Sequence, residues 1–133
     1  MLERQLDEIP SGIVHDLAVG VAPDGADAWM WPDAFVPGMT IGAPPDALNT
    51  RGQNWGMAPP HPWRLRAAGY APWIRLLRAC MRGAAGIRID HVLGLFRLWF
   101  VPEGGDPAAG TYVRYPVDDL LAVLALELSL IHI

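Results

Sequence analysis

The sequence has no lysine, and Cys80 is its single cysteine. One cysteine cannot form an internal disulfide, and no cysteine or histidine pair has the spacing of a zinc ligand set. Both observations fit a protein that works in a reducing compartment. We therefore predict a cytoplasmic protein without a structural metal, and we attribute the exclusive use of arginine to codon preference.

An excess of positive charge is also missing. The formal net charge is −4 and the isoelectric point is near 5.4, whereas a nucleic-acid partner requires a clustered positive surface. Neither a secretory signal nor a membrane span is indicated: the start lacks the basic and then apolar pattern of a signal, and the apolar run "LLAVLALELSLIHI" is short and interrupted by Glu127. We expect no nucleic-acid or membrane partner, and we interpret the run as a buried helix.

What the chain does have is a composition that is 52% apolar over 133 residues, which suits one globular domain. The end of a helix is expected at residues 2–8, and a strand with near-continuous burial at 12–21. Residues 22–62 are rich in glycine and proline and are predicted to form a long loop. Because such a loop is uncommon in a compact domain unless it has a function, and this one carries tryptophans, we predict that it is ordered.

The second half of the chain predicts a helix, a strand and a further helix. The helix starts at Pro72, with Ile74, Leu77 and Met81 inside and a solvated stripe of arginines at 75, 78 and 82. The strand "GIRIDHV" follows, and a last amphipathic helix begins near Pro116, where two aspartates suit its first turn. Together with the first strand this order predicts a βαβα unit and a parallel sheet.

The strand "GIRIDHV" carries the residues with the clearest chemistry. Alternation places Arg88 and Asp90 on one face and the two isoleucines on the other. An arginine beside a carboxylate favours its ionised form and orients it, so Asp90 suits attack on an electrophilic carbon at the carboxyl end of a strand. On strand geometry alone, a structural ion pair is an equally good interpretation.

Four blocks of the sequence resemble successive motifs of the 4-alpha-glucanotransferases, the amylomaltase or disproportionating enzyme family. They are "GIVHDLAVGVAPDGADAW", "GAPPDALNTRGQNWGM", "GIRIDHVLGLFRLWFVP" and "GTYVRYPVDDLLAVLALE". The resemblance implies an α/β fold that forms part of a (β/α)8 TIM barrel, with about two βα units and a long substrate-binding loop. Residues 1–127 would belong to this catalytic barrel domain, and residues 128–133, which do not resemble the family, to a non-native tail.

The same resemblance implies transfer of a 1,4-alpha-glucan segment to the 4-hydroxyl of glucose or of another glucan, with retention of configuration. Asp90 corresponds to the nucleophile, Arg88 to the arginine that hydrogen-bonds it, and His91 to a ligand of sugar hydroxyls. Further substrate-binding positions lie on either side of the cleft: Asp24, Trp29, Asp46, Gln53, Asn54 and Trp55. The partners expected are malto-oligosaccharides and starch- or glycogen-derived glucans, and no metal or organic cofactor is implied.

The sequence departs from the family pattern at two places. His15 and Ala18 stand where many members have glycine and proline, and the "GEDLG" block that carries the general acid/base is absent. Retaining chemistry needs a second carboxyl group about 5 Å from the first, so we predict that this chain alone completes no turnover. Two alternatives stay open: an amylase-like hydrolase or branching enzyme, and a non-catalytic glucan-binding fragment.

Overall fold

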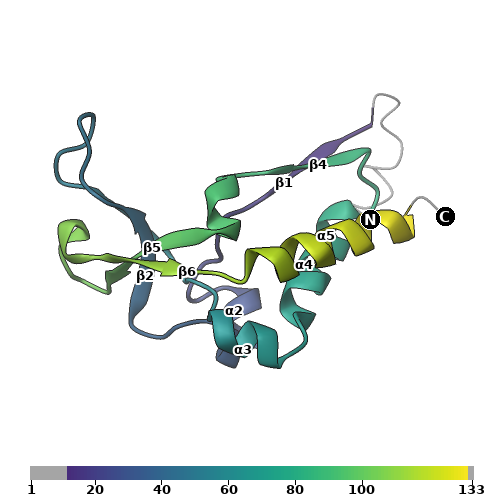
Figure 1. Cartoon of the computed structure of the whole chain (residues 1–133), viewed down its shortest axis with the longest axis horizontal. Helices are drawn as coiled ribbons and strands as arrows, with labels where there is room; N and C mark the ends of the chain where they lie inside the picture. Colours follow the sequence, from purple (N-terminus) through teal and green to yellow (C-terminus); the bar gives the residue numbers. More distant parts are fainter. Residues whose placement is uncertain (1–11, 132–133) are drawn as a thin grey trace.

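The computed structural model describes residues 12–131, which fold into two β-sheets packed against helices (Figure 1). The strands are β1 (Val14–Leu17), β2 (Met39–Ala43), β3 (Gln53–Met57), β4 (Gly86–Ile89), β5 (Arg97–Pro102) and β6 (Thr111–Arg114). The α-helices are α2 (Ala26–Met30), α3 (Pro62–Ala67), α4 (Ala71–Met81) and α5 (Val117–Ile131), with short 3-10 helices η1 (Pro32–Ala34), η2 (Val92–Leu95) and η3 (Pro107–Ala109).

The predicted parallel pair is confirmed by strands β1 and β4. They pair in parallel from Val14 opposite Gly86 to Leu17 opposite Ile89, and the helix α4 lies between them in the chain, as a parallel connection requires. Leu17 is buried against Leu77 and Met81 of α4. Two of the three inward positions predicted for this helix therefore hold the parallel pair in place.

The prediction of one long loop over residues 22–62 was wrong. This segment contains α2, η1, β2 and β3, and its strands join a four-stranded antiparallel sheet in the order β3-β2-β5-β6. The glycine that makes β2 look like a loop is required by its packing: a Cβ on Gly42 would lie 2.0 Å from the carbonyl oxygen of Gln53, beside a register shift between Ile41 and Gly42. Glycine inside a strand often marks such a bulge.

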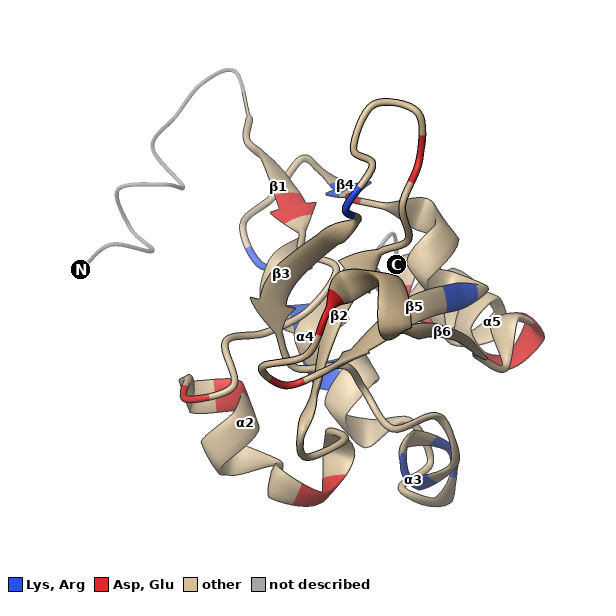
Figure 2. Cartoon of the chain, turned by 90° about the vertical axis from the view of Figure 1, so that its left-hand side faces the viewer, with Lys and Arg blue, Asp and Glu red and all other residues tan. Residues whose placement is uncertain are grey.

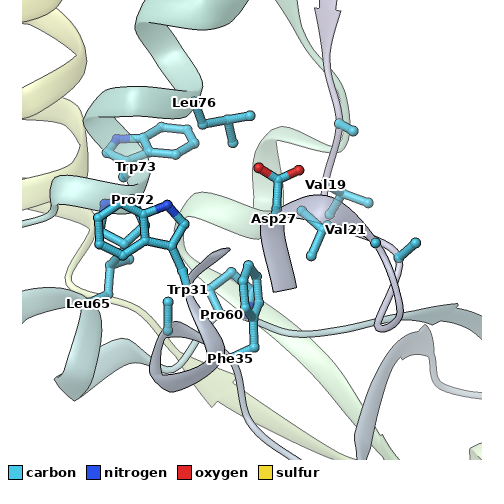
Figure 3. Close-up of a pocket in the computed structure, with 15 residues that line it drawn as sticks. Val19, Val21, Asp27, Trp31, Phe35, Pro60, Leu65, Pro72, Trp73 and Leu76 are labelled. Carbon is cyan, nitrogen blue, oxygen red and sulfur yellow. The ribbon is translucent and has the colours of Figure 1, made fainter. Parts of the chain in front are cut away.

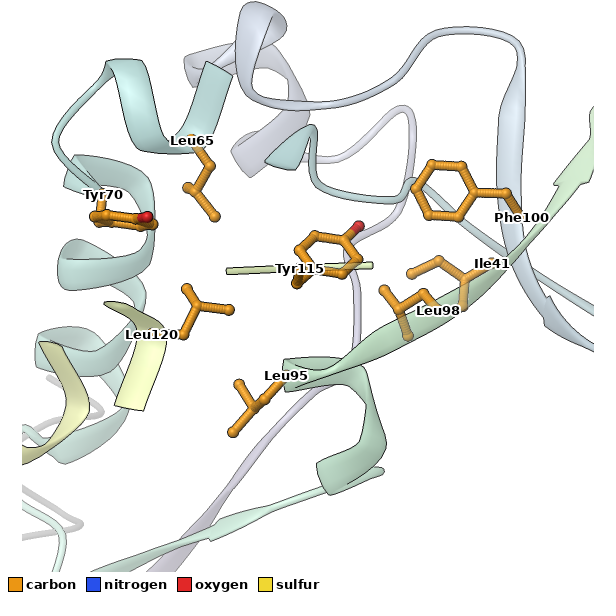
Figure 4. Packing of buried hydrophobic residues seen from close by; sticks show 8 residues of the cluster. All are labelled: Ile41, Leu65, Tyr70, Leu95, Leu98, Phe100, Tyr115 and Leu120. Atoms are coloured by element: carbon orange, nitrogen blue, oxygen red, sulfur yellow. The ribbon is translucent and has the colours of Figure 1, made fainter. Parts of the chain in front are cut away.

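The main core joins this sheet to the helices. Figure 4 shows Ile41, Leu98 and Phe100 from the sheet facing Leu65 and Tyr70 from α3 and the start of α4, with Tyr115 between them. The Tyr115 hydroxyl donates to the carbonyl of Pro60 at 2.6 Å. A buried aromatic with its polar end bonded fixes the position of the β6–α5 connection relative to the sheet.

Two predictions of burial were wrong. Val14 in β1 is 63% exposed and only Leu17 in that strand is buried, because the parallel sheet has two strands among the described residues and α4 covers one face. Helix α5 starts at Val117 with Asp118 and Asp119 in its first turn, as predicted. It is not a buried helix, however, since Leu126 and Leu130 are 57% and 52% exposed.

The arginines of α4 do not form a purely solvated stripe. The guanidinium carbon of Arg75 lies 5.3 Å from the centre of the Trp31 ring, and Arg78 donates to both carboxylate oxygens of Glu127, at 2.6 and 2.9 Å. Charge is divided among the elements, with basic residues on α3 and acidic residues on α2 and at the start of α5 (Figure 2). Arg75 and Arg78 therefore contact other elements of the fold, whereas the sequence had assigned both side chains to solvent.

The ends of the chain bear on two further predictions. The helix expected at residues 2–8 lies outside the described residues. Helix α5 continues past Glu127 to Ile131, into the segment interpreted as a tail. No helix within residues 12–131 has the length and apolar character needed to cross a membrane.

Candidate active site

The candidate nucleophile, Asp90, lies just beyond the carboxyl end of β4. The strand ends at Ile89, and the Asp90 amide donates to the carbonyl of Leu17 at 3.1 Å, so the parallel pairing holds its backbone. His91 then takes a left-handed conformation with φ of 48° and turns the chain into η2. Positive φ in a residue other than glycine is strained and is frequent at functional sites. Asp90 and His91 line the same hollow of about 60 Å³.

The arginine two residues earlier has a different carboxylate partner from the one predicted. Arg88 donates from Nε and Nη2 to the two carboxylate oxygens of Asp16, each at 2.6 Å. Residues 16 and 88 are paired across β1 and β4, so the strand register brings them together. The hydrogen bond from Arg88 lowers the pKa of Asp16. The same bond raises the pKa of Arg88, and the nearby charge of Asp90 raises it by a smaller amount.

Arg88 keeps hydrogen-bonding capacity after this pairing. A guanidinium group has five N–H donors, and the two bonds to Asp16 use Nε and one proton of Nη2. Neither proton of Nη1 takes part in that pair. Asp16 therefore fixes the plane of the guanidinium group, and the side chain can still act on a second anion near the end of β4.

Two blocks that lie far apart in the sequence meet at His91. The Trp55 and His91 rings make an edge contact, with centres 5.2 Å apart and planes at 82°. The Trp55 indole donates from Nε1 to Gln53 Oε1 at 2.9 Å, which fixes the ring on the outer strand β3. The structure thus brings Gln53, Trp55 and His91 together beside Asp90.

Asp46 and Asn54 have local roles in the hairpin between β2 and β3. The carboxylate of Asp46 accepts the amides of Leu48 and Asn49, at 2.8 and 2.6 Å, which closes a tight turn. Asn54 Oδ1 accepts the amide of Gly56 at 2.9 Å. Both side chains therefore shape the loop that carries Trp55.

Asp24 and Trp29 lie between β1 and η1, and neither lines the hollow shared by Asp90 and His91. Trp29, on α2, is 83% exposed. A separate hollow of about 290 Å³ lies next to this segment (Figure 3) and includes none of the predicted site residues. In Figure 3, Trp31 and Trp73 stand on one side of it and Val19, Val21 and Asp27 on the other.

Sequence reasoning missed several residues around the site. Asp16 was not among the predicted site residues, although its place opposite Arg88 follows once β1 and β4 are aligned in register. Trp99, Tyr112 and Arg97 lie on the antiparallel sheet next to His91; they fall within two of the family-like blocks, but no role was assigned to them. Within residues 12–131, no three side chains among histidine, cysteine, aspartate and glutamate are grouped to hold a metal ion.

The fold defined by these elements is that of the amylomaltases. The chain superposes on the crystal structure of amylomaltase from Corynebacterium glutamicum with a TM-score of 0.91 and 46% identity, over 97% of this chain and 20% of that one. It also superposes on amylomaltase from Streptococcus agalactiae, solved in complex with acarbose, with a TM-score of 0.81 over 88% of this chain and 25% of that one. At 22% identity the second match supports the fold alone.

Sequence comparison identifies the family. The family model described as 4-alpha-glucanotransferase matches residues 2–133. Relatives named 4-alpha-glucanotransferase from Mycobacterium tuberculosis and Haemophilus influenzae are 51% and 50% identical over 116 residues, which is 87% of this chain. The chain belongs to the 4-alpha-glucanotransferase family, as the resemblance of its motifs indicated. It spans 16% of the length of the mycobacterial relative and 17% of that from H. influenzae.

Proposed function

We propose that the chain contributes the nucleophile and part of the sugar-binding surface of a cytoplasmic 4-alpha-glucanotransferase. The observation that carries this proposal is the Trp55–His91 contact beside Asp90, which joins two family motifs at the end of a parallel strand. The parallel β1–α4–β4 unit supports placing the chain in a (β/α)8 barrel, where catalytic groups lie at the carboxyl ends of strands. The substrates are malto-oligosaccharides and other 1,4-alpha-glucans.

In the proposed reaction, a carboxylate oxygen of Asp90 bonds to the anomeric carbon of the donor glucan as the bond to the leaving 4-oxygen breaks. A general acid protonates that oxygen, and the family block that carries the acid is not among these 133 residues. The conjugate base of that acid then takes the proton of the acceptor 4-hydroxyl as the 4-oxygen displaces Asp90, which restores both the acid and the carboxylate. Arg88 would donate from Nη1 to the nucleophile and orient it, and Asp16 holds Arg88 by two hydrogen bonds.

Trp55 supplies an apolar ring on which a sugar face can stack, and His91 and Gln53 supply polar atoms for hydroxyls. Asp46 and Asn54 contribute by shaping the hairpin that presents Trp55. Asp24 and Trp29 are assigned to the donor side on the family motif. Acarbose in the S. agalactiae amylomaltase is a precedent for a glucan-like ligand on this fold.

A chimera tests the proposal: the chain replaces the matching segment of the C. glutamicum amylomaltase, and glucose release from maltotriose is measured. We expect transfer activity that Asp90→Asn lowers by about 10³-fold or more, as for other covalent nucleophiles. Asp33→Asn is the matched control, since its side chain is 97% exposed on η1. A fluorinated glucosyl donor should label Asp90, and a label on any other residue would refute the assignment.

A further inference from the structure

The outer face of the antiparallel sheet carries an aromatic cluster next to His91. Trp99 and Tyr112 are paired across β5 and β6, and their rings make an edge contact with centres 4.9 Å apart and planes at 72°. The guanidinium carbon of Arg97 lies 4.5 Å from the centre of the Tyr112 ring. The alternate residues of β5, Leu98 and Phe100, are buried in the core, so the cluster faces away from it.

The cluster is held rigidly. The Trp99 indole donates from Nε1 to the carbonyl of Pro107 at 2.9 Å, and Gly110 lies so close that a Cβ there would be 2.4 Å from Nε1. Tyr112, by contrast, is 45% exposed. A fixed tryptophan therefore supports a tyrosine that still presents part of its ring to solvent.

This cluster and His91 line a shallow hollow of about 50 Å³, together with Leu93 and residues 42–44. His91 also lines the hollow of Asp90, so the two hollows are adjacent. Within residues 12–131, no hydrogen bond involves the Tyr112 hydroxyl, the Arg97 guanidinium group or the ring nitrogens of His91. Polar groups with free hydrogen-bonding capacity thus converge on an aromatic surface.

We infer that this surface is a further sugar subsite, which binds one glucosyl ring of a glucan beyond the unit at Trp55 and His91. The inference rests on the proposed function. An aromatic ring offers an apolar surface for the C–H face of a sugar, and arginine N–H groups and a phenolic hydroxyl suit its hydroxyls. A hollow of about 50 Å³ can hold only part of a glucosyl ring. It therefore suits one neutral unit of a longer glucan chain, with the rest of that ring in solvent.

Binding of maltose and maltoheptaose to the isotopically labelled 133-residue chain, followed by NMR, tests the subsite. Maltoheptaose should shift the Trp99 indole N–H resonance, and Tyr112→Ala should weaken maltoheptaose binding by about tenfold while it changes maltose binding little. Arg97→Gln and Tyr112→Phe should weaken it less. Trp63→Ala is the control, because it removes a ring that is 74% exposed on α3, away from both hollows.

Two outcomes would overturn the subsite: no effect of Tyr112→Ala on maltoheptaose, or an equal loss for both sugars. Loss of maltoheptaose binding with rising salt would also overturn it, since that result indicates an anion site. Trp55→Ala separates this failure from failure of the proposed function. If it weakens both sugars while Tyr112→Ala weakens neither, only the subsite is wrong; if neither variant matters, the glucan-binding site is wrong as well.

A second measurement does not depend on the stability of the variants in the isolated chain. The same substitutions are placed in the C. glutamicum chimera, and KM is compared for maltotriose and maltoheptaose. We expect Tyr112→Ala to raise KM for the longer sugar about tenfold with kcat little changed. A uniform fall in kcat for both sugars would contradict a subsite and indicate a structural role.

Discussion

Arg88 and Asp16 face each other on neighbouring parallel strands and share two hydrogen bonds of 2.6 Å. Arg88 lies two residues before Asp90 in the chain. The geometry of the pair therefore affects the candidate nucleophile as well as the fold. Both side chains are more than half exposed, at 64% and 56%. We therefore expect the pair to matter more for orientation than for stability.

The Arg88–Asp16 pair predicts a pH dependence. Because the pKa of Asp16 is lowered in the folded chain, its stabilising contribution is present above the ordinary aspartate pKa of about 3.9 and is lost as the pH falls through the folded value. Thermal unfolding should show a smaller difference in Tm between pH 7 and pH 3 for Asp16→Asn than for the wild type. Asp24→Asn, which removes a carboxylate outside the pair, serves as control; an unchanged difference for Asp16→Asn would contradict the prediction.

The Arg78–Glu127 pair predicts an asymmetric response to mutation. The Glu127 side chain is 4% exposed, whereas that of Arg78 is 60% exposed. Arg78→Met leaves a buried carboxylate without its partner, so it should lower the free energy of unfolding more than Glu127→Gln, and Arg78→Met with Glu127→Leu should recover part of the loss. Chemical denaturation of the three variants measures this order. Equal losses in the two single variants would show that burial of the charge is not the dominant cost.

The hydrogen bond between Tyr70 and Asp119 predicts a loss of stability at alkaline pH. The Tyr70 hydroxyl donates to Asp119 at the start of α5, and burial, with the Asp119 carboxylate, raises its pKa to about 12. Its contribution is complete below the ordinary pKa of about 10 and disappears as the pH rises toward 12. Tyr70→Phe should cost about 1–2 kcal/mol at pH 7 and reduce the decline in unfolding free energy between pH 10 and 12. A variant as stable as the wild type at pH 7 would contradict this.

The close packing at Gly110 predicts that a side chain at this position would displace Trp99. Alanine there would place a Cβ 2.4 Å from Trp99 Nε1 and 2.5 Å from the carbonyl oxygen of Phe100. We expect Gly110→Ala to destabilise the chain by about 1–3 kcal/mol and to shift the Trp99 indole N–H resonance. Gly86→Ala is the matched control, since beyond its chain neighbours the atom nearest to the added Cβ would be Val14 Cγ2, 3.9 Å away. If both variants unfold at the wild-type denaturant concentration, the close packing at Gly110 is refuted.

Local signals in the sequence predicted the helices α4 and α5 and the parallel pair. Apolar spacing and Pro72 placed α4, and Pro116 with two following aspartates placed α5. The strands β2 and β3 were missed because glycine and proline dominate their surroundings, and the reason for Gly42 is contact with another strand. The exposure of α5 could not be read from its composition, since burial depends on what packs against it.

The sequence motifs suggested members of the candidate site but not the contacts between them. The motifs named Asp90, His91 and Trp55, but the ring contact between the last two depends on how a hairpin folds over the end of β4. Similarly, Arg88 was paired with Asp90, which is near in sequence, whereas its observed partner is 72 residues away. Pairing across strands depends on register, and register is settled only when the whole sheet forms.

The edge contact between Trp55 and His91 is the place where two separately built parts of the molecule meet. The candidate nucleophile Asp90 follows a strand of one sheet, and the aromatic hairpin belongs to the other. Under the proposed function, mutations in the hairpin would change which sugars are accepted without altering Asp90. The hairpin could then be exchanged as a unit to adjust chain-length preference while the proposed reaction is retained.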